Sequence, residues 1–296
     1  MKTAYMFPGQ GSQSNGMGKE LYDNSPAARA VFDQVDTALG QKLSALIFDG
    51  DAAELNLTQN TQPAIFAVSM ADWAARTERG EIDTGAFVLG HSLGEYAALS
   101  AAGCFGVADG ARLLRRRGEL MAAAVPVGVG AMAAIIGIDE EVLEEMCEAA
   151  SKPGLGDSGL PVCEIANDNG GGQFVISGDK AAVESVVAAA QNGGAKIAKV
   201  LPITIPAHST LMEVTADDIM KEILAIEWSA PKFPFISNKT ANLMPDLDDI
   251  KMSLVYQMSH GVRWRECVLK ARELGVTEFI EVGPGTVLTG LVKRIM

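Results

Sequence analysis

The sequence predicts an α/β protein: a core with a mostly parallel sheet, and a smaller βαββαβ unit inserted into it. Two observations support this. Short apolar runs of strand length alternate with helical segments in both outer thirds of the chain, as in parallel sheets covered by helices. In the middle, two strand-like runs follow each other directly and the order changes. A chain of 296 residues is long enough for a large and a small domain.

The N-terminal part begins with a predicted strand at residues 4–7, where an apolar run stops at Pro8-Gly9. A helix is predicted from Pro26, since Ser25 can cap its start, to residue 39, where Gly40 can end it. Pro63 is predicted to open the next helix, which ends near Gly80. A strand at 86–89 and a helix at 95–102 complete this alternation.

The middle of the chain gives a complete βαββαβ pattern, which is the order of ferredoxin-like units. The predicted elements are strands 130–136, 162–166, 174–177 and 195–203 and helices 139–150 and 180–191, with a surface loop at 152–159. Beyond residue 206 the outer pattern resumes, with predicted elements at 209–226 (amphipathic helix), 279–282 (strand) and 287–295 (helix). The expected domains are therefore 1–127 with 205–296, and 128–204.

Composition excludes several classes of protein. A formal charge of −13 disfavours nucleic acid or an anionic membrane as the main partner. The uncharged stretch 120–138 is broken by Pro126 and three glycines, so it is not expected to span a bilayer. No signal peptide is expected, because Pro8-Gly9 interrupts the first apolar run. The four cysteines form no CxxC pair, which indicates buried free thiols, a cytoplasmic location and no metal site.

A nucleophile is suggested by Gly90-His91-Ser92-Leu93-Gly94, which fits G-x-S-x-G between a predicted strand and a predicted helix. Such a sharp turn exposes the serine hydroxyl, and small flanking residues relieve its crowding. The helix start adds free N–H groups and the positive end of the helix dipole. A plain serine N-cap is the alternative.

Only three histidines can serve as the general base. His91 is next to Ser92, so its side chain should diverge and order the turn. His260 lies in a polar loop and is expected at the surface. His208 follows a predicted strand and precedes a predicted helix, where α/β folds place catalytic groups, and is favoured. Since nearly every acid between Ser92 and His208 lies in the inserted unit, an amide or backbone carbonyl should orient the histidine.

Arg117 is predicted to be buried, although it belongs to the run Arg115-Arg116-Arg117. It lies three or four residues from Leu113, Leu114, Leu120 and Met121, and so shares their apolar helix stripe. A buried guanidinium keeps its charge and needs an anion. The partner is either a protein carboxylate or a substrate carboxylate.

These motifs together resemble the malonyl-CoA:acyl carrier protein transacylase family. The resemblance covers the whole chain, in the order Phe7-Pro8-Gly9-Gln10-Gly11-Ser12-Gln13, Gly90-His91-Ser92-Leu93-Gly94-Glu95-Tyr96, Arg117-Gly118, Pro206-Ala207-His208, Gln257 and Glu281-Val282-Gly283-Pro284-Gly285. It implies an α/β-hydrolase-like core with a ferredoxin-like insertion.

The resemblance also implies a role for each matching residue: Ser92 as nucleophile, His208 as base, the N–H groups of Gln10 and Leu93 as oxyanion hole, Arg117 for the malonyl carboxylate, and the carbonyl of Gln257 to orient His208. The implied reaction is ping-pong transfer of malonyl from malonyl-CoA to acyl carrier protein, in fatty acid biosynthesis, without cofactor or metal. A monomer is expected. Ala207 leaves the discrimination between malonyl and methylmalonyl open.

Two other functions fit parts of the sequence. A serine hydrolase such as a thioesterase shares the turn around Ser92, but Arg117 and the missing triad acid disfavour it. A non-catalytic carrier-binding subunit is the other. An acidic carrier protein would need a local positive patch, for which Lys196 and Lys199, with Arg115 and Arg116, are candidates.

Overall fold

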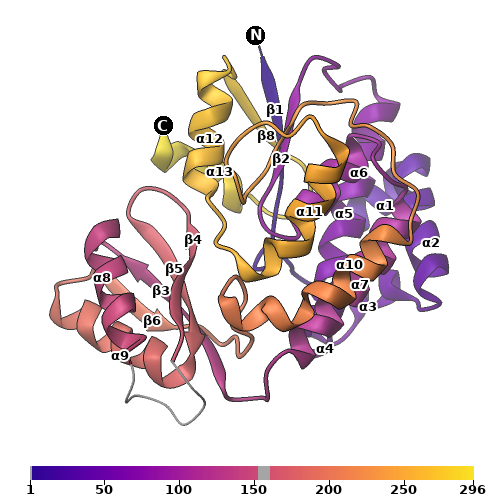
Figure 1. The fold of residues 1–296 in the computed structure, drawn as a ribbon. Helices are drawn as coiled ribbons and strands as arrows, with labels where there is room; N and C mark the ends of the chain where they lie inside the picture. The colour runs from indigo at the N-terminus through magenta and orange to yellow at the C-terminus, as the bar shows by residue number, and fades with distance from the viewer. Residues whose placement is uncertain (1, 153–160) are drawn as a thin grey trace.

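The fold contains two sheets with helices packed against them (Figure 1). The computed structural model describes residues 2–152 and 161–296. In this part of the chain, one four-stranded sheet is parallel and the other is antiparallel. The mixed α/β class predicted from the sequence is confirmed.

The parallel sheet has the strand order β7-β2-β1-β8. Its strands are β1 (Thr3–Phe7), β2 (Phe87–Gly90), β7 (Phe235–Ile236) and β8 (Glu278–Glu281). The central strand β1 alternates between two hydrophobic cores: Tyr5 and Phe7 face one, and Ala4 and Met6 face the other. Both faces of the sheet are therefore covered, which explains why its strands read as continuous apolar runs.

The larger core lies under helices from the N-terminal half and from after residue 215: α1 (Lys19–Asn24), α2 (Pro26–Leu39), α3 (Leu43–Asp49), α4 (Ala52–Leu55), α5 (Thr58–Glu78), α6 (Gly94–Ala101), α7 (Val107–Ala123), α10 (Ala216–Leu224) and α11 (Leu247–Tyr256). The opposite face is covered by α12 (Trp264–Glu273) and α13 (Val287–Ile295). Ser25 accepts a hydrogen bond from Ala28 N and Gly40 has φ 60°, so α2 begins and ends as its sequence predicts.

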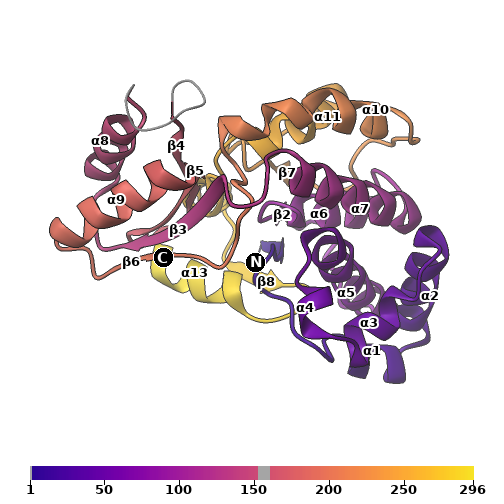
Figure 2. The ribbon, with the colours of Figure 1, turned by 90° about the horizontal axis from the view of Figure 1, so that it is seen from below.

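The antiparallel sheet has the order β4-β5-β3-β6, and two helices pack against it. Its elements follow the chain order β3 (Gly130–Ile136), α8 (Glu140–Ala150), β4 (Cys163–Asp168), β5 (Gln173–Asp179), α9 (Lys180–Asn192) and β6 (Ile197–Val200). This unit has a hydrophobic core of its own and sits beside the parallel sheet, close to α13 (Figure 2). Most of the predicted loop 152–159 lies outside the described residues.

Three predicted elements are wrong in detail. Pro63 lies inside α5 instead of opening it, because the helix begins five residues earlier, at Thr58. At this start, Thr61 Oγ1 and Asn60 Nδ2 donate to the Leu55 and Glu54 carbonyls. The helix predicted at 209–226 begins as the 3₁₀ helix η1 (Thr210–Thr215), where Thr215 Oγ1 donates to the Met212 carbonyl. Strand β6 ends at Val200, before Pro202, which has no N–H for the sheet.

The four cysteines are free and buried, as predicted. Within the described ranges, no helix is long and apolar enough to cross a membrane. No group of three or more His, Cys, Asp or Glu side chains in these ranges is arranged to hold a metal ion.

Candidate active site

Ser92 stands at a strained turn between β2 and α6. Its φ of 53° lies in the left-handed region that residues with a Cβ seldom adopt. The glycines of the motif make the turn possible: a Cβ on Gly90 would overlap the Gly94 backbone, and one on Gly94 would overlap the Phe7 carbonyl. Ser92 N donates to Asn238 Oδ1 at 2.8 Å. The turn is therefore held both by its own glycines and by the hydrogen bond to Asn238.

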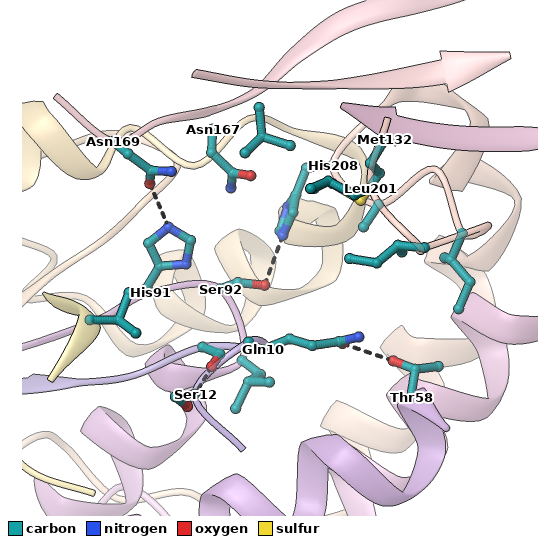
Figure 3. A pocket seen from close by; sticks show the side chains of 18 of the residues that line it. Gln10, Ser12, Thr58, His91, Ser92, Met132, Asn167, Asn169, Leu201 and His208 are labelled. Atoms are coloured by element: carbon teal, nitrogen blue, oxygen red, sulfur yellow. Dashed lines mark hydrogen bonds between the residues drawn. The ribbon is translucent and has the colours of Figure 1, made fainter. Parts of the chain in front are cut away.

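His208 faces Ser92, with its Nε2 2.7 Å from Ser92 Oγ (Figure 3). Its Nδ1 lies 2.9 Å from the Gln257 carbonyl and 3.1 Å from the His260 carbonyl. Because carbonyls only accept, Nδ1 carries the proton and Nε2 is free to accept one from Ser92. Burial, followed by the charge of Arg117, lowers the pKa of His208 to about 3, so the imidazole is neutral at physiological pH.

The backbone that carries His208 differs from the sequence prediction. Strand β6, which precedes His208, belongs to the antiparallel sheet, so the histidine does not follow a parallel strand. Irregular chain from 201 to 207 carries it to Ser92. His208 has φ 62°, and its N–H donates to the Met258 carbonyl at 2.8 Å. Both members of the pair are thus held in strained backbone conformations.

Two free N–H groups lie on the wall of the same cavity. Leu93 N is at the start of α6, and Gln10 N is in the loop after β1; neither donates a hydrogen bond to any described residue. The Gln10 side chain is fixed by Thr58, whose Oγ1 donates to Gln10 Oε1 at 3.0 Å (Figure 3). Two unpaired donors beside a nucleophile can stabilise an oxyanion.

Arg117 is 1% exposed, so its predicted burial is confirmed. Its Nη1 donates to Gln62 Oε1 at 2.7 Å, and its Nη2 donates to Gln257 Oε1 at 2.8 Å and Ser92 Oγ at 3.2 Å. Arg117 Nε has no hydrogen-bond partner. No carboxylate among the described residues forms an ion pair with it, so the alternative of a direct protein ion pair receives no support.

Gln257, in the 3₁₀ helix η2 (Gln257–Ser259), contacts all three of these residues. Its backbone carbonyl accepts from His208, its Oε1 accepts from Arg117, and its Nε2 donates to the Ser92 carbonyl at 2.8 Å. The sequence suggested only the carbonyl contact. The side chain adds a rigid link between nucleophile, base and guanidinium.

The cavity, about 220 Å³ in volume, lies between the two sheets. The wall opposite Ser92 is mostly apolar and is formed by Met132, Val175, Leu201, Ile203, Ile205, Ala207 and the α13 residues Val287, Leu288 and Leu291. Asn167 and Asn169 are the polar exceptions. Asn169 Oδ1 lies 2.9 Å from His91 Nε2 (Figure 3). His91 therefore ties the turn at Ser92 to the antiparallel unit.

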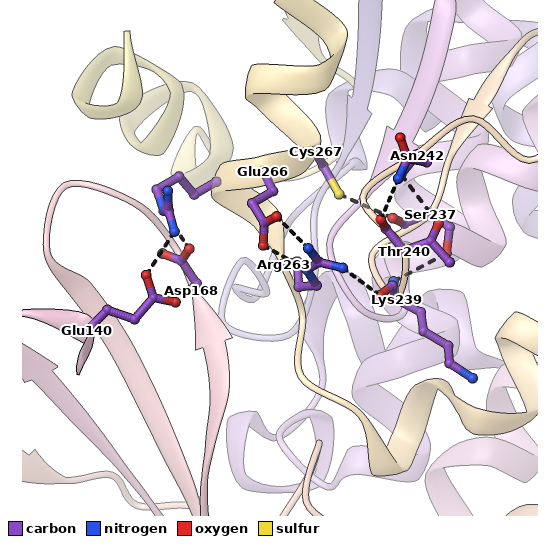
Figure 4. Close-up of polar contacts among 10 residues, drawn as sticks. Glu140, Asp168, Ser237, Lys239, Thr240, Asn242, Arg263, Glu266 and Cys267 are labelled. Carbon is purple, nitrogen blue, oxygen red and sulfur yellow. Dashed lines mark hydrogen bonds and ion pairs between the residues drawn. The ribbon is translucent and has the colours of Figure 1, made fainter. Parts of the chain in front are cut away.

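The end of β4 is tied to the parallel part by ion pairs. Arg265 of α12 donates from Nε to Asp168 Oδ2 at 2.6 Å and from Nη2 to Glu140 Oε2 at 2.9 Å, and Figure 4 shows the two carboxylates side by side. Asp168 N also donates to the Val262 carbonyl. These contacts fix the segment that presents Asn167 and Asn169 to the cavity.

The remaining candidates divide clearly. His260 is exposed and contributes only its backbone carbonyl to the site. It forms no hydrogen bond with Ser92 in the described structure. Arg115 is not an outward cation: it donates to Asn60 and Gln41. Arg116 lies 3.5 Å from both Glu119 and Glu222. Of the proposed positive patch, only Lys196 and Lys199 remain exposed without a salt bridge among the described residues.

The buried polar residues at the site that the sequence analysis did not single out include Gln62, Glu95 and Asn238. Glu95 had a signal, since it is a carboxylate in an otherwise apolar, alanine-rich helix. Gln62 and Asn238 had none, because their contacts join residues far apart in the chain.

Residues 4–296 match the acyl transferase domain family. The chain therefore belongs to this family and is an acyltransferase.

The names of its relatives specify a narrower activity. The chain is 45% identical over 294 residues to the malonyl CoA-acyl carrier protein transacylase of Bacillus subtilis, covering 99% of this chain and 90% of that protein. It is 42% identical to that of Escherichia coli K12, over 99% and 92%. The acyl-carrier-protein-S-malonyltransferase of Bartonella henselae superposes with a TM-score of 0.95 at 48% identity, over 100% and 93%.

A further solved structure contains a carrier protein. It is a malonyl-transacylase in complex with a type II PKS acyl-carrier protein, 39% identical to this chain, with a TM-score of 0.94 and coverage of 100% and 93%.

Proposed function

We propose that this chain transfers malonyl from malonyl-CoA to the phosphopantetheine thiol of acyl carrier protein in fatty acid biosynthesis. One observation carries the choice of malonyl: a buried guanidinium, without an ion-pair partner among the described carboxylates, lies 3.2 Å from Ser92 Oγ. A fully desolvated cation beside the nucleophile suits an acyl group that brings its own carboxylate. The names of the relatives support the same activity.

In the first half-reaction, Ser92 Oγ attacks the thioester carbonyl of malonyl-CoA and His208 Nε2 takes its proton. The N–H groups of Gln10 and Leu93 stabilise the tetrahedral oxyanion; removing one such donor typically costs about 3–4 kcal/mol. Collapse breaks the C–S bond, and the coenzyme A thiol leaves with the proton from His208. Malonyl remains as an ester on Ser92.

In the second half-reaction, His208 takes the proton of the phosphopantetheine thiol, which attacks the malonyl-serine ester. The same oxyanion site is used, and Ser92 leaves with the proton returned by His208. Every step is acyl or proton transfer, so the proposed mechanism uses no cofactor. The Gln257 carbonyl orients His208 in place of a triad carboxylate.

Arg117 couples recognition to base strength. Its charge is the second cause of the lowered pKa of His208, after burial. A malonyl carboxylate bound to Arg117 would offset that charge and raise the pKa of His208. The base therefore becomes stronger when the correct acyl group is bound, while acetyl would leave it weak.

We also propose the finer fold assignment: an α/β-hydrolase-like core of residues 1–127 and 205–296, and a ferredoxin-like unit of residues 128–204. The β4-β5-β3-β6 order and the separate hydrophobic core of that unit support it. The monomeric state stays a prediction.

The test is intact-mass measurement after addition of malonyl-CoA. The wild-type protein should gain one malonyl group and lose it when phosphopantetheinylated acyl carrier protein is added. Ser92→Ala should show no adduct. Ser100→Ala, which changes a buried serine of the same helix away from the cavity, should still be acylated. An adduct on Ser92→Ala, or rapid release of free malonate without a carrier, would refute the proposed transfer.

A further inference from the structure

Glu95 is a buried carboxylate that the transfer chemistry leaves without a task. It is 0% exposed and lies in the first turn of α6, three residues after Ser92. One carboxylate oxygen accepts from Asn238 N at 2.6 Å, and the other accepts from Gln257 Nε2 at 2.5 Å. Burying a carboxylate is unfavourable, so the presence of Glu95 in the interior needs an explanation.

Both donors to Glu95 hold the reacting groups. Asn238 accepts from Ser92 N at 2.8 Å and donates from Nδ2 to the Gly90 carbonyl at 2.6 Å, so it braces the turn at Ser92. Gln257 contacts Ser92, His208 and Arg117. Glu95 is thus the shared acceptor behind both braces, without touching the substrate cavity itself.

We propose that ionised Glu95 is a positioning residue that sets the orientation of the Gln257 amide, and through it the position of Arg117. This inference rests on the proposed malonyl transfer. With Nε2 donating to both Glu95 and the Ser92 carbonyl, Gln257 must present Oε1 to Arg117. Arg117 has only donors, so the opposite amide orientation would place an NH₂ group against a guanidinium.

Only a carboxylate satisfies both donors. A glutamine at position 95 has one oxygen, so its NH₂ group would face either Asn238 N or Gln257 Nε2. The conflict with Gln257 Nε2 is relieved when the Gln257 amide rotates by half a turn. Its NH₂ group then faces Arg117 and displaces the guanidinium. Protonation of Glu95 acts in the same direction, because the oxygen that gains the hydrogen becomes a weaker acceptor and one of the two hydrogen bonds is weakened.

The ionisation of Glu95 is therefore expected to matter near neutral pH. Burial raises the pKa of Glu95 to about 7, and the hydrogen bonds from Asn238 and Gln257, followed by the charge of Arg117, partly oppose this. The titratable groups that face Glu95 are Arg117 from α7, Tyr96 from its own helix and Cys267 from α12. His208 does not titrate in the same range, because its pKa is lowered to about 3. Because a bound malonyl carboxylate also raises the pKa of His208, a loss of activity between pH 8 and 6 reports Glu95 when the loss is absent in Glu95→Gln.

The test compares Ser92 acylation by malonyl-CoA and acetyl-CoA in the wild type, Glu95→Gln and Asp36→Asn. Asp36 is the matched control, since it is a buried carboxylate with two hydrogen bonds to Ser44, outside the cavity. Glu95→Gln should slow malonyl acylation by about tenfold or more, as for a buried polar mismatch, and acetyl acylation by less. Asp36→Asn should leave the malonyl-to-acetyl ratio unchanged.

The pH profile separates positioning from a structural role. Wild-type malonyl acylation should fall as the pH is lowered through about 7, and at low pH its malonyl-to-acetyl ratio should approach that of Glu95→Gln. The variant should lack this step. A wild-type malonyl-to-acetyl ratio that stays constant while activity falls with pH overturns the proposal, and this measurement does not depend on the folding of a variant. An equal loss for both acyl groups also overturns it. Absence of malonyl acylation in the wild type would instead refute the proposed function.

Discussion

The two walls of the cavity are built on different principles. The wall around Ser92 is charged and densely hydrogen bonded: Arg117 lies in it, and Gln257 and Glu95 are buried behind it and connected to it. The facing wall, from the antiparallel unit and α13, is mostly apolar side chains such as Met132 and Leu201. The first wall can perform acyl transfer, whereas the second can only shape and dry the space beside it.

The difference also appears in the backbone. Ser92 and His208, whose side chains are in hydrogen-bond contact, are two of the three non-glycine residues with positive φ in the described chain. Strain of this kind is stable only where surrounding contacts fix it. The bonds of Ser92 N to Asn238 and of His208 N to Met258 supply such contacts. Changes in the polar wall should therefore alter rates strongly, and changes in the apolar wall should alter selectivity mildly.

His208→Ala should have a large effect, because one base serves both half-reactions. Losses of about a hundredfold to ten-thousandfold are typical for a general base. The measurement is the single-turnover rate of Ser92 acylation and of transfer to the carrier protein. His260→Ala is the matched control, since only its backbone carbonyl approaches the site. If His260→Ala were the slower variant, the assignment of the base would be wrong.

Met132→Ala tests the apolar wall and should have a smaller effect. The shortened side chain leaves room for an extra methyl group, so kcat/KM for methylmalonyl-CoA should rise relative to malonyl-CoA by about tenfold, the lower end for one methyl or methylene. Met146→Ala makes the same change in the antiparallel unit away from the cavity. A large loss of malonyl transfer itself in Met132→Ala would contradict the division between the walls.

The smallest effect is expected outside the cavity. Lys196 and Lys199 are exposed, and reversing both to Glu should raise KM for acyl carrier protein several-fold, because rim charges mainly affect encounter. KM for malonyl-CoA should not change. Lys221→Glu/Lys270→Glu gives the same charge change on α10 and α12 as a control. Equal increases for both substrates would exclude this patch as a carrier site.

The sequence predicted those parts of the site that depend on local spacing. Ser92 was identified from its glycines, and the burial of Arg117 from its distance to four apolar residues on one helix face. The choice of His208 was helped by there being only three histidines. Of the fold, the alternation of elements and most boundaries of the antiparallel unit were predictable from apolar periodicity.

The parts that were missed depend on contacts between distant segments. Glu95 meets Asn238 and Gln257 across more than 140 positions, and nothing local to either partner indicates it. The two-residue strand β7 is too short to give a periodic signal, so the segment that carries Asn238 was not recognised. Pro63 misled the prediction because proline favours the first position of a helix, whereas α5 begins five residues earlier, at Thr58.

The most direct test of the account is the ratio of malonyl to acetyl kcat/KM in Arg117→Ala. Malonyl transfer should fall by about two orders of magnitude, since a buried substrate charge loses its partner, while acetyl transfer should be maintained or rise. Arg116→Ala, which removes the neighbouring surface arginine, should leave the ratio unchanged. An unchanged ratio in Arg117→Ala, with both transfers reduced alike and a lower Tm, would show that Arg117 is structural and would contradict the choice of malonyl.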